Sequence, residues 1–215
     1  PPTPPATPTP PATPMIMGTS DQYLVRTTHD HEAGRVRLLF FGIVRAYKGL
    51  DVLLRALALA PEVLTLTVAG EFWGGTAATE QLIAELGLGD RVTLRPGYVP
   101  ASEIPELFAA ADALVLPYRE ATASQNAQLA FSYGVPVITT TAGSLAEHVT
   151  DGVDGLTAAP GNVDDLLRAL RLIAEPQTLE RLRKGVQAPD PGPAWARYVL
   201  AVTGSSAPVL RAGGR

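Results

Sequence analysis

The stretch LLFFGIVRAYKGLD, residues 38–51, contains the pattern from which the fold can be inferred. Its first four residues are apolar without a polar break, which predicts a buried strand that ends at Gly42. Arg45 and Lys48 follow in the turn, although the whole chain has only 17 lysines and arginines. After Gly49 the leucines recur at helical spacing. The stretch therefore predicts a strand, a basic turn and a helix in direct succession.

The rest of the chain repeats this alternation of strand and helix. Predicted strands cover 36–43, 63–70, 91–99, 112–118, 135–140 and 154–159. Predicted helices cover 49–60, 76–88, 102–111, 124–134, 144–152 and 162–176, with two more near 177–186 and 193–202; Ser102 and Asn162 are the expected N-caps. The strands are apolar throughout, which is typical of strands covered on both faces. The predicted fold class is α/β, a doubly wound parallel sheet with C-terminal helices.

The composition narrows the function classes. A chain of 215 residues that is 46% hydrophobic can bury one large core. A net charge of -4 and the lack of a basic block argue against nucleic-acid binding. There is no cysteine, which excludes disulfides and thiolate zinc sites, and His29 and His31 read as solvated loop, so no metal site is predicted. No apolar run reaches the ~18 residues of a membrane span, and the start resembles no signal peptide, so the expected location is the cytoplasm.

Composition also suggests the domain boundaries. Residues 1–14 hold eight of the 20 prolines and predict an extended, polyproline-like linker without fixed contacts. Residues 15–34 are mixed and polar, and we expect a poorly ordered lead-in. The regular pattern occupies 35–203, and the small polar residues of 204–215 predict a flexible tail.

In a parallel sheet the loops after the strands gather at one edge, where ligands bind. These loops are 42–49, 70–76, 97–102, 117–124 and 140–144. Helices are predicted to begin after the last two, and their N-terminal amides would suit an anion. Together with Arg45 and Lys48 they favour a phosphate-bearing ligand, and a diphosphate has the span to reach both features. The alternative is a solvated basic turn without a ligand. Neither a GxxxxGK[ST] nor a GxGxxG pattern is present.

Aromatic and acidic residues on the same face leave two further alternatives open. Phe72 and Trp73 would either stack on a ring of the ligand or cover the edge of the core. Glu120 would either bind a sugar hydroxyl or be an ordinary surface glutamate.

Five segments together resemble the C-terminal domain of the GT-B fold glycosyltransferases of family 4, over about 35–203. The segments are FFGIVRAYKGLDVLLRAL (40–57), VAGEFWG (68–74), GYVP (97–100) followed by IPELFAAADALVLPY (104–118), SQNAQLAFSYGVPVITTTAGSLAEHVTDGVDGL (124–156) and WARYVLA (195–201). The resemblance implies a Rossmann-like half of a GT-B fold that binds a nucleotide-diphosphate sugar. It also implies transfer of a sugar, of the hexosyltransferase type, with retention of configuration and without a metal or cofactor.

The resemblance also implies roles for individual residues. Arg45 and Lys48 would contact the donor diphosphate, and Glu120 would be an approximate counterpart of an acid that contacts the ribose. The donor-binding loops would contribute the residues Gly42, Gly70, Tyr98, Ser124, Gln125 and Asn126. This chain departs from many members at Ile43, which replaces an arginine, and at Leu129, which replaces a second glutamate.

Complete enzymes of this type carry the acceptor site on an N-terminal Rossmann-like domain. The resemblance therefore implies that residues 1–215 need that domain or a partner subunit and are inactive alone. An acceptor at a peripheral membrane surface is a further expectation. The alternative, from a different class, is a non-catalytic nucleotide-binding or interaction module derived from the fold. A third reading is an epimerase or phosphorylase relative.

Overall fold

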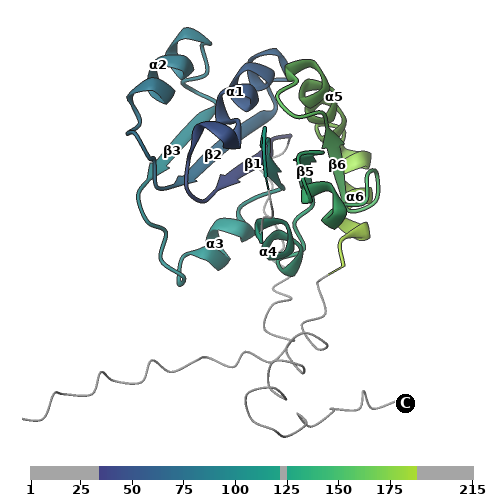
Figure 1. Ribbon diagram of the computed structural model, residues 1–215. Helices are drawn as coiled ribbons and strands as arrows, with labels where there is room; N and C mark the ends of the chain where they lie inside the picture. The colour runs from purple at the N-terminus through teal and green to yellow at the C-terminus, as the bar shows by residue number, and fades with distance from the viewer. Residues whose placement is uncertain (1–33, 122–124, 188–215) are drawn as a thin grey trace, which may run out of the picture.

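The computed structural model describes residues 34–121 and 125–187, which form one α/β domain (Figure 1). Its strands form a parallel six-stranded sheet in the order β3-β2-β1-β4-β5-β6. The predicted doubly wound sheet is therefore confirmed. The predictions for the linker, the lead-in, Ser124, the helix near 193–202 and the tail lie outside the described residues.

The strands lie where the apolar runs predicted them, each shorter by a few residues at its ends. Their bounds are β1 Val36–Phe41, β2 Leu64–Gly70, β3 Val92–Pro96, β4 Ala113–Leu116, β5 Val137–Thr140 and β6 Gly155–Ala158. The helices are α1 Leu50–Leu59, α2 Ala77–Glu85, α3 Ile104–Ala109, α4 Asn126–Ser132, α5 Val163–Ile173 and α6 Pro176–Gly185, with the 3₁₀ turns η2 Ala46–Lys48 and η3 Leu145–His148. None of the helices in the described residues combines the length and the apolar character needed to cross a membrane.

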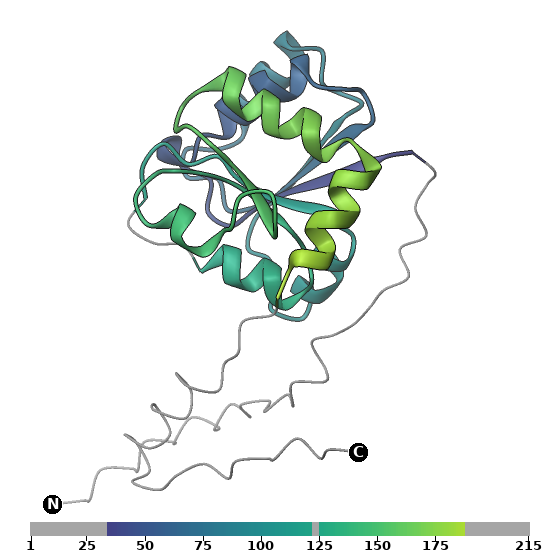
Figure 2. The same cartoon turned by 90° about the vertical axis from the view of Figure 1, so that its right-hand side faces the viewer.

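Helices cover both faces of the sheet. The helices α1, α2 and α5 lie on one face, and α3 and α4 lie on the other (Figure 1). The view in Figure 2 shows the green helix α5 and the teal helix α4 on opposite sides of the twisted strands. Neighbouring residues of β1 accordingly belong to different core clusters. Phe40 belongs to the cluster with α1 and α5, and Leu39 belongs to the cluster with α3 and α4. Burial of both faces explains why the central strands read as continuous apolar runs.

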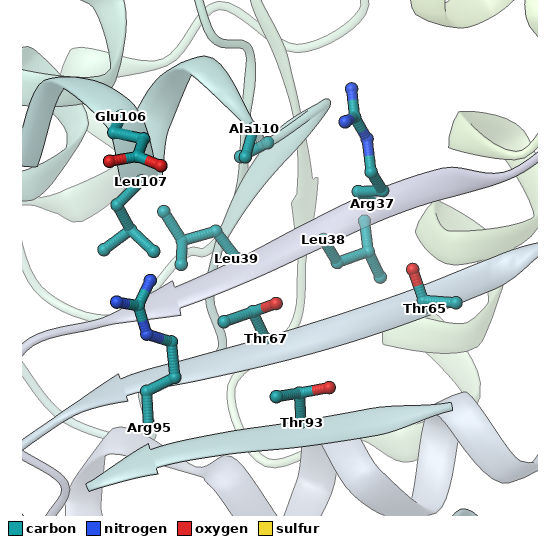
Figure 3. Close-up of a pocket in the computed structure, with 11 residues that line it drawn as sticks. Arg37, Leu38, Leu39, Thr65, Thr67, Thr93, Arg95, Glu106, Leu107 and Ala110 are labelled. Carbon is teal, nitrogen blue, oxygen red and sulfur yellow. The ribbon is translucent and has the colours of Figure 1, made fainter. Parts of the chain in front are cut away.

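The expectation that every strand is apolar on both sides is wrong at the β3 edge. Thr93 and Arg95 of β3 are exposed, and Thr65 and Thr67 of β2 are half-buried. Together with Arg37 of β1 they line a cavity of about 270 Å³ beside α3 (Figure 3). The reason is that α3 has only six residues, and none of the residues of β3 belongs to the core cluster of α3 and α4.

Two expectations about helix starts and extents are also wrong. Ser102 is not the N-cap of α3, because the cap position is Glu103 and it forms no side-chain cap bond. The helix predicted over 144–152 is only the four-residue 3₁₀ turn η3. There the Asp154 carboxylate accepts a hydrogen bond from the Thr150 amide at 2.7 Å, a local side-chain bond that competes with helix formation.

The cap predicted at Asn162 is confirmed and is testable. Its Oδ1 accepts a hydrogen bond from the Asp165 amide at 3.0 Å, which satisfies one free donor of the first turn of α5. We expect Asn162→Ala to lower the free energy of unfolding by about 1 kcal/mol. Thr76 is the matched control, since it occupies the N-cap position of α2 without a side-chain cap bond. Equal losses for Asn162→Ala and Thr76→Ala in urea unfolding would contradict this role of Asn162.

Candidate functional site

The strand order locates the site. Strands β1 and β4 are neighbours, with Leu38 paired to Ala113, although their helices α1 and α4 pack on opposite faces. The chain therefore leaves the sheet in opposite directions at this point, and we call the region bounded by the loops after β1 and β4 the crevice. Ligands of doubly wound sheets bind at such a switch point, outside the carboxyl ends of the strands.

The loop after β1 is held against the loop after β2 by backbone contacts. The amide of Gly42 donates to the Ala69 carbonyl at 2.9 Å, and the amide of Val44 donates to the Glu71 carbonyl at 2.8 Å. Gly70 is required at this contact, because a β-carbon there would lie 2.0 Å from the Gly42 carbonyl oxygen. Gly42 and Gly70, both predicted from the sequence, are thus in contact with each other.

Arg45 packs on an aromatic ring of the same loop pair. Its guanidinium carbon lies 3.6 Å from the ring centroid of Trp73, a cation–π contact. Its Nε is buried and has no hydrogen-bond partner among residues 34–121 and 125–187. Trp73 remains 62% exposed, whereas Phe72 packs against the core of α1 and α5. The sequence left open whether Phe72 and Trp73 stack on a ligand ring or cover the edge of the core. In the structure Phe72 covers the edge of the core, and Trp73 stacks with Arg45.

Lys48 lies beside the loop after β4. Its Nζ is 5.2 Å from the ring centroid of Tyr118, which belongs to the loop after β4. Burial lowers the pKa of Lys48, and the positive charge of Arg45 lowers it further. Within the described part of the chain, no carboxylate forms an ion pair with Arg45 or Lys48. The crevice therefore holds two partly buried cations that no carboxylate of the described domain neutralises.

Asn126 brings the start of α4 to the same point. Its side-chain Nδ2 donates to the Phe41 carbonyl at 3.0 Å, which ties α4 to the end of β1. A β-carbon built on Gly42 would lie 3.4 Å from this Nδ2 and 3.7 Å from Nζ of Lys48. Gly42, Lys48 and Asn126 therefore lie next to one another. Gln125 occupies the exposed N-cap position of α4 and forms no side-chain cap bond.

The two remaining predicted residues lie at the rim. Tyr98 is 76% exposed on the loop after β3, and Glu120 is exposed on the loop after β4. No hydrogen bond or ion pair within the described residues joins either side chain to Arg45 or Lys48. Leu129, the position of the expected second acid, packs against the core of α3 and α4.

Sequence reasoning missed three residues that shape the crevice. Gly49 has φ +66, and a β-carbon there would lie 2.0 Å from the Pro117 carbonyl oxygen. Arg119 of the loop after β4 and Asp51 of the first turn of α1 form an ion pair, with Nη2 and Oδ2 2.6 Å apart. A usable signal existed for Arg119, since it is the first charged residue after a buried strand, as Arg45 is. Among the described residues, no group of three or more His, Cys, Asp or Glu side chains could hold a metal ion.

Comparison with known proteins gives the family. The family model for the glycosyl transferases group 1 matches residues 35–175, so the chain belongs to this family. Its sheet and helices form the Rossmann-like domain of a GT-B fold, as expected from the resemblance in its motifs.

Curated relatives are longer than the region that matches this chain. A D-inositol 3-phosphate glycosyltransferase from Catenulispora acidiphila is 31% identical over 196 residues, which cover 85% of this chain and 46% of the relative. Across eight curated relatives, the match covers between 27% and 46% of the relative's length.

Solved structures agree with the fold. Anabaena HepE, solved with UDP and glucose, matches with a TM-score of 0.66 and 27% identity, over 73% of this chain and 43% of HepE. The C-terminal domain of the Francisella tularensis protein LpcC, a group 1 glycosyl transferase, matches with a TM-score of 0.63 over 71% of this chain and 82% of that domain. At 21% identity the LpcC match shows the fold alone.

Proposed function

We propose that residues 34–187 form the donor-binding domain of a glycosyltransferase that uses a nucleotide-diphosphate sugar. One observation carries the proposal: the crevice between the loops after β1 and β4 contains Arg45 and Lys48, both partly buried, and no carboxylate of the described domain pairs with them. Membership in the glycosyl transferases group 1 supports it, as does the presence of UDP in the similar HepE structure.

The electrostatics of the crevice favour a dianionic ligand. Burying a cation costs free energy unless an opposite charge is near, and two neighbouring cations also repel each other. The lowered pKa of Lys48 reflects both effects. A diphosphate bound between Arg45 and Lys48 would offset them and would raise the pKa of Lys48 again. The same charges would stabilise the diphosphate as it leaves the sugar, which is an electrostatic contribution to catalysis.

The other predicted residues have proposed positions around that diphosphate. Gly42 and Asn126 adjoin Lys48, so the phosphates would lie against them, with the backbone amide of Gln125 as an additional donor; Ser124 lies outside the described residues. Tyr98 would lie on the side of the base, and Glu120 would approach a hydroxyl of the ribose or sugar. Retention of configuration and independence from metals and cofactors remain proposals from the family resemblance.

The acceptor belongs to the remainder of a complete enzyme. We propose that an N-terminal domain or a partner subunit supplies it, because the match covers less than half of each curated relative. An acceptor at a membrane surface and a cytoplasmic location are parts of the same proposal. Residues 1–215 alone should then bind the donor without transferring the sugar.

Titration of the protein with UDP by calorimetry tests the proposal. We expect the protein to bind UDP, and we expect Lys48→Ala and Arg45→Ala each to weaken binding about tenfold or more, the usual loss for a hydrogen bond to a charged group. Arg171→Ala is the control, since Arg171 is exposed in the last turn of α5 and belongs to neither loop of the crevice. That variant should bind as tightly as the unchanged protein.

The main alternative is a non-catalytic module that retains the fold. Ile43, exposed at the crevice where many family members have an arginine, is the observation that favours it. Absence of binding to both UDP and GDP at millimolar concentration would support this alternative and contradict the proposed function.

A further inference from the structure

Arg119 connects the two loops of the crevice through four hydrogen bonds. Its Nη1 donates to Oδ1 of Asp51 at 2.8 Å and to the Ala46 carbonyl at 3.0 Å, and its Nη2 donates to Oδ2 of Asp51 at 2.6 Å. Its backbone amide donates to the Tyr47 carbonyl at 2.7 Å. All four acceptors belong to η2 or to the first turn of α1. One residue of the loop after β4 therefore holds the whole basic turn after β1.

The basic turn has little stability of its own. Its 3₁₀ helix η2 has three residues, no buried residue and no side-chain cap bond at Arg45. Its internal bonds run from the Lys48 amide to the Arg45 carbonyl at 2.9 Å and from the Gly49 amide to the Ala46 carbonyl at 3.2 Å. A single 3₁₀ turn is only marginally stable in isolation, so outside contacts must hold it. The loop after β2 holds its start, and Arg119 holds its middle and end.

Arg119 is itself poorly placed to bind a ligand. Both terminal nitrogens already donate to Asp51, and Nη1 also donates to Ala46. The hydrogen bond from Arg119 lowers the pKa of Asp51, so the carboxylate is charged at neutral pH and cancels the charge of the guanidinium. A bidentate arginine–carboxylate contact fixes orientation as well as distance. The pair therefore fixes the position of the loop after β4 relative to the first turn of α1, and it adds no net charge to the crevice.

We propose that Arg119 and Asp51 are positioning residues, which set the direction of the Lys48 and Arg45 side chains toward the diphosphate of the donor. This proposal rests on the proposed function. A positioning role and a purely electrostatic role predict opposite results for one substitution. Asp51→Asn removes a negative charge beside the crevice and frees Arg119, which would tighten the binding of an anion if charge alone mattered. If position matters, the same substitution weakens binding.

Calorimetric titration with UDP separates the two roles. We expect Asp51→Asn and Arg119→Lys each to raise the Kd for UDP about five- to tenfold, because a lysine keeps the charge and loses the bidentate contact. Unchanged or tighter binding by Asp51→Asn would overturn the proposal. Glu180→Gln is the matched control, since it breaks the exposed ion pair with Lys184 on α6 and should leave the Kd unchanged.

Hydrogen exchange tests the positioning without any ligand. In Arg119→Lys the amides of Lys48 and Gly49 should exchange at least about fivefold faster, while those of α5 stay unchanged. Unchanged exchange at Lys48 and Gly49 would refute the positioning role even if UDP binds. If the unchanged protein fails to bind UDP, the proposed function fails, and the exchange rates still decide whether Arg119 holds the turn.

Discussion

Replacing Asp112 with asparagine is expected to lower the free energy of unfolding by about 3 kcal/mol, the scale of breaking a buried ion pair. Asp112 precedes β4 and is 0% exposed. Its Oδ2 accepts hydrogen bonds from the Arg37 amide at 2.7 Å and from Nε of Arg37 at 3.2 Å, and its Oδ1 accepts one from Nη2 of Arg183. One carboxylate thus joins β1, β4 and α6. Asparagine would keep the shape but turn an amide group toward a guanidinium.

The same substitution should change the dependence of stability on pH. Burial raises the pKa of Asp112, but the hydrogen bonds and positive charges of Arg37, together with the charge of Arg183, outweigh burial and leave the pKa below its usual value. A carboxyl whose pKa is lower in the folded state contributes stability above its unfolded pKa of about 3.9. That contribution is lost as the pH falls through the folded pKa. The difference between the protein and Asp112→Asn should therefore shrink below about pH 4.

Urea unfolding at pH 7 and at acidic pH measures both effects. Asp90→Asn is the control, because Asp90 is exposed in the turn before β3. It should change the stability by less than about 0.5 kcal/mol. Similar losses for Asp112→Asn and Asp90→Asn, or a loss for Asp112→Asn that does not depend on pH, would contradict this account.

Gly49→Ala is expected to have a similarly large effect, also about 3 kcal/mol. Part of the loss comes from the left-handed conformation of Gly49, with φ +66, which costs a residue with a β-carbon roughly 1 kcal/mol. The larger part comes from the contact with Pro117, whose carbonyl oxygen would lie 2.0 Å from the new β-carbon. The loops after β1 and β4 would have to separate, so UDP binding should weaken as well.

Gly87→Ala separates these two contributions. Gly87 also has φ +66, but a β-carbon there would have nothing within 4 Å. We expect this variant to lose about 1 kcal/mol, measured by the same urea unfolding, and to bind UDP normally. If Gly49→Ala and Gly87→Ala lose equal stability, the contact between the two loops is not the reason for glycine at position 49.

Much of the fold could be read from local patterns. Apolar runs and helical spacing are set by neighbours in the chain, so they predicted the six strands, most of the helices and the cap at Asn162. The basic turn with Arg45 and Lys48 was identified for the same reason, as an unusual pair of charges between two apolar segments. Local patterns gave a wrong prediction at β3, where one face of the strand is not buried by a helix. They also gave a wrong prediction after residue 148, where the Asp154 side chain accepts a backbone hydrogen bond that competes with helix formation.

The shape of the crevice depends on which strands are neighbours, and spacing along the chain carries no such information. Arg119 and Asp51 are 68 positions apart, and Arg37 and Asp112 are 75 apart, yet each pair meets because β1 lies beside β4. The cations of the crevice could thus be predicted from the amino-acid sequence, since they follow a buried strand. Their partners could not, because long-range packing alone brings Pro117 to Gly49 and Arg119 to Asp51.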